Sequence, residues 1–395
     1  MKARIKTAAL FLVILLTTLT LSDGVGAQTA NPKVVKLSLD QAIDQALKHS
    51  SDLKLAQIAI DKAQIAVDKA ENGKEQMEDA KDKLSSIGQW NDSFDNDLVM
   101  YYYPRQARYA LTMAEKAKAL KEKKVRLETQ QLYYEALKAQ MMRDVKKRSL
   151  DKAQEMVRLA YANQKAGVFS KLDVQNAETL AASAKAEYIA YENKFQIARM
   201  KLNKQLGLDL DTPLQLTTVL NYVPSNDLDV EKTIKDTVAE SLDIYSANEA
   251  ASLAALKAQL ADKYYTSNVF TNREAQTAKA EAEAKKEKTE VEVRLAVKQA
   301  YYTLKSAEER INVLKASISR AREGLRITTL RYQKGMATNA ELLDARVSLE
   351  QVEAQYAEAI FDYNLARAQF TSRLFVLAGS EAQTTASTGT GGAGF

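Results

Sequence analysis

The sequence lacks the residues from which most metal centres and catalytic sites are built. Its 395 residues include no cysteine and a single histidine, His49. Disulfides and thiolate ligands are therefore excluded, and His49 has no second histidine with which to share a metal ion. No glycine-rich phosphate loop follows a strand, and no nucleophile motif is present. We predict no catalytic residue, no metal site and no cofactor, so the chain is not expected to be an enzyme.

A strong charge of one sign is also missing. The chain has 56 lysines and arginines against 51 aspartates and glutamates, for a net charge of +5. Because the two signs are interleaved along the chain, they indicate solvated helix faces with ion pairs between neighbours. No basic patch is available for nucleic acid, and we predict no nucleic-acid partner.

The first 27 residues have the composition of a secretory signal peptide. Lys2, Arg4 and Lys6 precede an apolar run over residues 8–21, and a stretch of small residues ends at Ala27. This pattern is typical of a signal peptide that is cleaved after Ala27, and the run is shorter than the ~20 residues that cross a bilayer. We predict an exported protein, with an uncleaved membrane anchor as the alternative.

Helix-breaking residues are scarce. The four prolines are Pro32, Pro104, Pro213 and Pro224, and they mark boundaries because proline costs about 3 kcal/mol inside a helix. The proline-free segment from Glu274 to Lys334 has apolar residues three and four apart. That spacing is typical of helices that pack side by side over many turns. We predict an all-α fold of long antiparallel helical hairpins.

One hairpin occurs twice in the chain. Adding 168 to the residue number maps ten apolar or aromatic positions of one helix onto ten of another. The first set is Val174, Ala177, Ala181, Ala184, Tyr188, Tyr191, Phe195, Ala198, Leu202 and Leu206. The second set is Leu342, Ala345, Leu349, Val352, Tyr356, Ala359, Tyr363, Ala366, Phe370 and Leu374. We call these two sets the seams of the first and second hairpin.

The turn before each seam matches as well. Gly167 aligns with Gly335, and Ser170 aligns with Thr338. Glycine suits the left-handed cap that ends a helix, and serine or threonine suits the N-cap of the helix that follows. The turns are therefore predicted to have the same construction.

A second match, at an offset of 191, joins residues 37–53 to residues 228–244. Each half therefore opens with a similar short amphipathic helix. The first half has about 23 more residues, which fall near residues 74–103, where the sequence is irregular and includes a β-prone run. We predict a signal peptide at 1–27, a first helical repeat at 28–207, a connector at 208–227, a second repeat at 228–378 and a disordered tail rich in Gly, Ser and Thr at 379–395.

Two segments carry a resemblance to a known family. Residues 37–53 read LSLDQAIDQALKHSSDL, and residues 331–345 read RYQKGMATNAELLDA. With the duplication and both glycine turns, the chain resembles the TolC-type outer-membrane efflux proteins from about Leu37 to Leu377. In that family three chains form a long helical tunnel that opens at the outer membrane, and the helical tips meet an adaptor protein of an inner-membrane pump.

The resemblance implies an exported envelope protein that forms an oligomeric duct for transmembrane export. Its expected location is the outer membrane and periplasm of a cell with two membranes, or the extracytoplasmic surface of a cell with one. Its expected partners are two further copies of the chain, a periplasmic-type adaptor and an inner-membrane pump.

The sequence departs from the family where membrane strands are expected. Family members insert a β-hairpin in each half, and a membrane strand needs about 9–11 residues. Residues 83–104 and 264–273 are too short for two such strands each, although residues 264–270 could form one short strand. We predict that membrane strands are absent or vestigial, and the sequence does not support direct membrane insertion.

The hairpin turns are the candidate functional site. The resemblance implies adaptor contacts at Gly167, Ser170, Leu172, Gly335, Thr338 and Leu342. It also implies an acidic ring at the tunnel entrance from Asp173 and Glu341, although either carboxylate could instead stabilise its own helix N-terminus. The seam positions expected to hold each hairpin together include Ala177, Ala181, Tyr188, Ala345, Leu349 and Tyr356.

Assembly is expected because alanine-rich seams bury little area, and long rods need burial from neighbouring chains. Two alternatives to an export duct remain. One is a secreted coiled-coil structural or binding protein of the envelope that forms no channel. The other is an adaptor of the membrane-fusion type, against which the chain lacks the expected β-rich segments.

Overall fold

The computed structural model describes residues 34–218, 221–225, 227–334, 336–337 and 339–374. The predicted signal peptide and the predicted tail lie outside the described residues. The first half comprises β1 (Val35–Leu37), α1 (Leu39–His49), α2 (Ser51–Ser86), α3 (Phe94–Asp97), the π-helical turn η1 (Leu98–Tyr102), α4 (Tyr103–Lys165) and α5 (Lys171–Leu206). The second half comprises β2 (Leu214–Leu216), α6 (Val230–Glu240), α7 (Leu242–Tyr264), α8 (Phe270–Gln333) and α9 (Asn339–Ser372).

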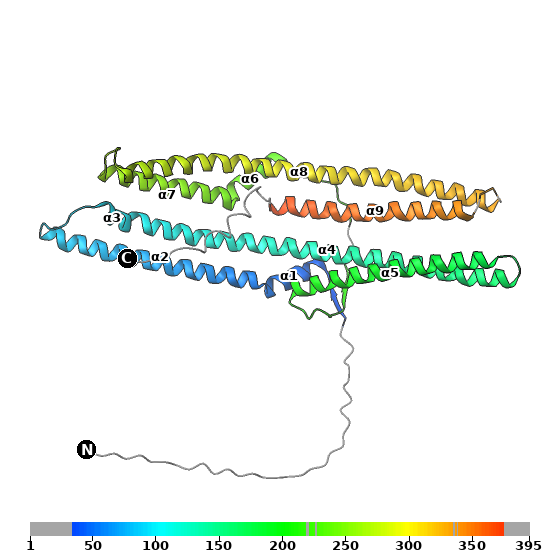
Figure 1. The fold of residues 1–395 in the computed structure, drawn as a ribbon. Coiled ribbons are helices and arrows are strands. Elements are labelled where there is room, and N and C mark those ends of the chain that lie inside the picture. Colours follow the sequence, from blue (N-terminus) through cyan, green and yellow to red (C-terminus); the bar gives the residue numbers. More distant parts are fainter. Residues whose placement is uncertain (1–33, 219–220, 226, 335, 338, 375–395) are drawn as a thin grey trace, which may run out of the picture. The chain divides into compact units, whose positions relative to one another are not determined.

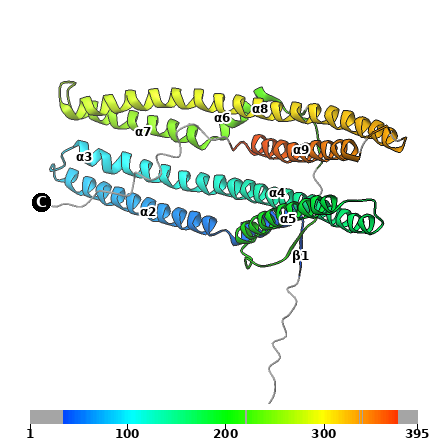
Figure 2. The same ribbon diagram turned by 45° about the vertical axis from the view of Figure 1, so that its right-hand side comes forward.

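The predicted all-α fold with a duplicated hairpin is confirmed. In Figures 1 and 2, α4 lies beside α2 and α5, and α8 lies beside α7 and α9. The long helices α4 and α8 have 63 and 64 residues, which makes each about 95 Å long at 1.5 Å per residue. The α4–α5 and α8–α9 hairpins align at the predicted offset of 168.

Each hairpin is held by the seam that the sequence predicts. In the first hairpin Phe195, Ala198, Leu202 and Leu206 are buried, and in the second the buried positions include Ala359, Tyr363 and Phe370. Toward the turns the burial is thinner, and a small cluster of Ala160, Val174 and Ala177 is what remains of the first core there. The best-packed part of each hairpin therefore lies far from its turn.

A short parallel ladder, which the sequence did not predict, ties the start of the chain to the connector. Val35 pairs with Leu214 and Leu37 with Leu216. Tyr133 of α4, which is fully buried, lies beneath this ladder. Its hydroxyl donates to the carbonyl of Leu37 at 2.9 Å and accepts from the backbone N–H of Thr218 at 3.2 Å. Tyr133 therefore fastens the connector to the first hairpin.

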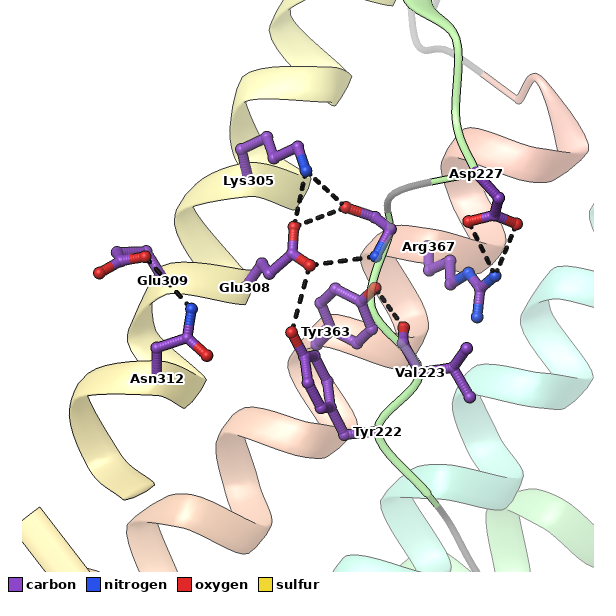
Figure 3. A network of polar contacts seen from close by, with 10 residues as sticks. Tyr222, Val223, Asp227, Lys305, Glu308, Glu309, Asn312, Tyr363 and Arg367 are labelled. Atoms are coloured by element: carbon purple, nitrogen blue, oxygen red, sulfur yellow. Dashed lines mark hydrogen bonds and ion pairs between the residues drawn. The ribbon is translucent and has the colours of Figure 1, made fainter. Parts of the chain in front are cut away.

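A different group fastens the connector to the second hairpin. Figure 3 shows Glu308 of α8, whose carboxylate accepts from four donors. These are the Tyr222 hydroxyl at 3.1 Å, the Ser225 N–H at 3.0 Å, the Ser225 hydroxyl at 2.5 Å and the Lys305 ammonium at 2.8 Å. On the other side of the connector, the Tyr363 hydroxyl donates to the Val223 carbonyl at 2.6 Å.

These contacts decide the ionisation of Glu308. Burial by itself would raise its pKa, but the hydrogen bonds from Lys305, Ser225 and Tyr222 outweigh that effect and lower the pKa from 4.5 to about 2. Burial and the hydrogen bond to Glu308 raise the pKa of Tyr222 to about 12, so its proton stays in place as a donor.

The extra residues of the first half form helical segments that pack together, and they form no strand. They extend α2 to Ser86 and form α3 and η1. Asp97, which is buried, accepts from the Lys263 ammonium and the Tyr264 hydroxyl, both at 2.8 Å. Phe94 packs edge-on against Tyr265, with ring centroids 5.5 Å apart. The turns of the two halves are thus bonded to each other.

Two segments with some strand character are helical or irregular in the structure, in line with the predicted absence of membrane strands. The β-prone run at residues 98–103 forms η1 and the first residue of α4, and Leu98 and Met100 are buried in this helical turn. Residues 264–270 are not a strand either, since α7 continues to Tyr264 and α8 begins at Phe270. Among the described residues, β1 and β2 are the only strands. Within the same ranges, no helix combines the length and the apolar character needed to cross a bilayer.

We predict that Y133F destabilises the protein by roughly 1–3 kcal/mol, because the Thr218 N–H loses its partner while the ring still fills its site. Urea unfolding measures the loss. Y134F is the matched control, since the neighbouring hydroxyl only accepts from the Gln130 side chain. Equal losses in the two variants would contradict the role of Tyr133.

We predict that E308Q weakens the protein at neutral pH by about 1.5–3 kcal/mol, because four donors lose a charged acceptor. The folded pKa lies below the unfolded value, so the contribution of the carboxylate is complete above pH 4.5 and is lost as the pH falls toward 2. The stability difference between wild type and E308Q, measured by urea unfolding at pH 7, 5, 4 and 3, should be constant at first and then shrink. A difference that is the same at pH 7 and pH 3 would refute this assignment.

Candidate functional site

The first hairpin turn, between α4 and α5, opens with backbone hydrogen bonds that end α4. Gly167 has a left-handed φ of +75°. Its N–H donates to the carbonyl of Gln164 at 3.0 Å, and the N–H of Val168 donates to that of Asn163 at 2.9 Å. This pair of bonds is the Schellman arrangement that ends a helix with glycine. The predicted glycine cap is therefore present in the structure.

The next helix begins with a capping box, in which two residues satisfy each other's backbone. The Asp173 N–H donates to the Ser170 hydroxyl at 3.2 Å, and the Ser170 N–H donates to the Asp173 carboxylate at 2.8 Å. The Ser170 hydroxyl also donates to this carboxylate, at 2.7 Å. These bonds, led by the one from the hydroxyl, hold the pKa of Asp173 below its usual range. Asp173 is exposed and ionised, and it stabilises its own helix N-terminus.

The second turn, between α8 and α9, repeats one feature of the first. The N–H of Met336 donates to the carbonyl of Arg331 at 2.8 Å, and these residues correspond to Val168 and Asn163. Gly335 and Thr338 lie outside the described residues, so their predicted roles in this turn stay predictions. Glu341 is exposed in the first turn of α9.

Both turns present apolar side chains at the surface. Val168 is 70% exposed and Leu172 is 63% exposed at the first turn, and Met336 is 67% exposed at the second. Leu342, by contrast, is buried in the seam of its hairpin, as is its counterpart Val174. Of the two leucines expected to make contacts, Leu172 is therefore at the surface and Leu342 is in the packed interior.

The remaining seam positions are covered to different degrees. Ala177 is buried, whereas Ala181, Tyr188, Ala345, Leu349 and Tyr356 are partly buried. The Tyr188 hydroxyl donates to Glu192 on the same helix at 3.4 Å. These positions lie where the two helices of each hairpin face each other.

The chemistry of the site is that of a contact surface. No group of three or more His, Cys, Asp and Glu side chains in the described residues could hold a metal ion. His49 ends α1 and packs on Gly207, where an added Cβ would lie 2.9 Å from the His49 Cβ.

Sequence reasoning missed Val168 and Met336, although an apolar residue beside a turn glycine was a usable signal. It also missed Glu308, which looks like any other acid on a charged helix.

The fold and the turns define a class: a duplicated pair of long antiparallel helical hairpins whose paired turns offer exposed apolar contacts. A sequence profile of the family described as outer membrane efflux protein matches residues 104–208 and 227–380. The chain belongs to this family, which consists of channels and not of enzymes. Membership places the protein in the cell envelope. No curated protein matches the sequence.

Solved structures share the fold at low sequence identity. The outer membrane protein VceC from Vibrio cholerae is 17% identical, with a TM-score of 0.64 over 86% of this chain and 97% of that chain. A membrane protein from Pseudomonas aeruginosa is 16% identical, with a TM-score of 0.65 over 85% of this chain and 90% of that chain. The CmeC outer membrane channel from Campylobacter jejuni is 15% identical, with a TM-score of 0.64 over 85% of both chains.

We predict that G167A destabilises the protein by about 1–2 kcal/mol, because an L-residue is strained at this φ. An added Cβ meets nothing within 4 Å, so crowding is not the cause. G324A is the control, since Gly324 lies inside α8 in equally open space. That change should stabilise the helix by about 0.5–1 kcal/mol. Urea unfolding of both variants should give shifts of opposite sign, and shifts of the same sign would contradict the strain.

Proposed function

We propose that several copies of this chain assemble into a helical duct in the cell envelope and that an export system moves its cargo through this duct. The family match supports an efflux role. Two hairpins of equal register in each chain supply repeated units that can be placed side by side around a channel. By analogy with the family we propose three copies, delivered across the inner membrane by the signal peptide.

The observation that carries the proposal is the pair of apolar turns. Val168, Leu172 and Met336 are exposed on turns whose backbone is tied by the same hydrogen bond in both hairpins. Exposed apolar groups on a rigid support are what a partner protein can bury at low entropic cost. We propose that these side chains contact a periplasmic-type adaptor, which links the duct to an inner-membrane pump.

The other turn residues then have a supporting role. Gly167 and Ser170 set the shape of the first turn, and Gly335 and Thr338 are proposed to do the same for the second. Leu342 acts through the seam. Asp173 and the matched Glu341 would place negative charge at the duct entrance, and the capping box keeps Asp173 ionised there.

Light scattering and electron microscopy of the purified mature protein test the assembly. We expect a discrete oligomer and ring-shaped end views, because a chain of such long helices needs burial from neighbours. A monomer that shows no ring would refute the duct. It would favour the secreted coiled-coil alternative that forms no channel.

Site-specific photo-crosslinking in the native envelope tests the adaptor contact. A photoreactive phenylalanine at Leu172 or Met336 should capture a second envelope protein with a helical hairpin, identified by mass spectrometry. The control position is Ile87, an equally exposed apolar residue at the C-terminal cap of α2. Capture of the same protein from all three positions, or of none from the turns, would contradict the proposal.

A further inference from the structure

A groove of about 360 Å³ lies between α4 and α9, where the two hairpins of one chain meet. In both Figures 1 and 2 these two helices lie side by side. The walls of the groove are mainly apolar, with Leu137 and Met141 on α4 and Ile360 and Phe361 on α9. A hollow of this size and character, at the junction of two packed units, is typical of a small-molecule site.

The groove runs along α4 and has a different residue at each end. Thr218 of the connector lies at the Leu137 end, because Tyr133, one helical turn before Leu137, donates to its hydroxyl at 3.1 Å. Arg148 lines the opposite end, about 16 Å farther along α4. This span is about the length of an extended dodecanoate chain.

Two ion pairs join α4 to α9 near the ends of the groove. Lys138, beside Leu137, pairs with Glu358, and Lys152, one turn beyond Arg148, pairs with Glu350 at 3.0 Å. These pairs help to fix the spacing of the two helices. The groove is therefore formed before a ligand arrives, and binding does not have to order its walls.

The internal repeat shows that this face of the helix has a different task in each half. Adding 168 to the residue number maps Leu137 and Gln140 onto Lys305 and Glu308 of α8. In Figure 3, Lys305 and Glu308 bind Ser225 of the connector, so the connector covers that face in the second half. In the first half the same face lines the groove, and Gln140 has no hydrogen bond to any described residue.

Arg148 gives the groove a positive charge at its end. Asp144 is the acid nearest to it on the groove wall, but this carboxylate already accepts two hydrogen bonds from Arg143, at 2.9 and 2.6 Å. Arg148 is exposed and has no ion pair within the described part of the chain. Its guanidinium has the planar, forked geometry that matches a carboxylate.

We propose that this groove binds a single-chain amphiphile with a carboxylate head, such as a medium-chain fatty acid. The apolar chain lies along Leu137, Met141 and Phe361, and the carboxylate binds the guanidinium of Arg148. One copy of the protein builds the whole groove, so the site is present with or without a duct.

Isothermal titration calorimetry of the mature protein, free of detergent, tests the head group. The probes are decanoate, decanol and decyltrimethylammonium, which share one chain. Decanoate should bind at least threefold more tightly than decanol, as a solvent-accessible ion pair allows, and the cation should bind most weakly. R148Q should lower the affinity for decanoate to that for decanol and leave decanol unchanged. R126Q, at an exposed arginine of α4 outside the groove, should bind as wild type does.

Chain length and a filling substitution test the apolar wall. From octanoate to dodecanoate the affinity should rise about fourfold per methylene, the effect of burying one CH₂ group. A357F places a ring in the groove from the α9 side, since Ala357 lines it. This variant should lose the binding of decanoate and of decanol, while its helical content and unfolding midpoint stay within the range of R126Q.

Each result bears on one part of the inference. Equal binding of decanoate to wild type and R148Q would overturn the role of Arg148 and the carboxylate head. Binding that survives in folded A357F would place the ligand outside this groove. A wild-type protein that binds none of the probes would overturn the site as a whole, and it would leave the duct standing because the duct does not require the groove.

Discussion

The seam between antiparallel helices is the interaction on which the rest of this structure depends. A helix of more than sixty residues has no core of its own, so it persists only where a partner helix covers one face. The aromatic and leucine positions do this far from the turns, where Leu202, Tyr363 and Phe370 are almost fully buried. Near the turns the seam is rich in alanine, and hydrogen bonds at the helix caps stabilise the hairpin instead. The hairpin turns are thus held mainly by hydrogen bonds, and they bury few apolar side chains.

The two halves share one backbone arrangement, but different side chains make the corresponding contacts in each half. The connector is fastened by Tyr133 in the first half, but the residue at the matching position, Tyr301, packs against Phe370. In the second half that task belongs to Glu308, whose first-half counterpart is Gln140. Equivalent positions can therefore be held by unlike groups, provided that each buried polar atom has a partner.

Patterns that depend on neighbours in sequence were the predictable part of this protein. The 168-residue offset, the glycine cap at Gly167 and the Ser170 N-cap follow from local backbone chemistry, and the structure shows the two caps as the sequence indicated. The run at residues 98–103 is helical despite its β propensity, and its Leu98 is buried among residues of α7 and α8. The seam pattern did separate the two leucines beside the turns, since Leu342 is a seam position and Leu172 is not, and the structure buries the first and exposes the second.

The sequence by itself determined the long helices, their pairing into two matched hairpins, and the family to which those hairpins belong. It did so because helix periodicity and capping are properties of residues a few positions apart. Tertiary structure alone decided which faces of α4 and α9 form a groove, and where Asp97, Tyr133 and Glu308 find their partners. Their partners lie up to 167 residues away in the sequence, and only the folded chain brings such distant groups within hydrogen-bonding reach.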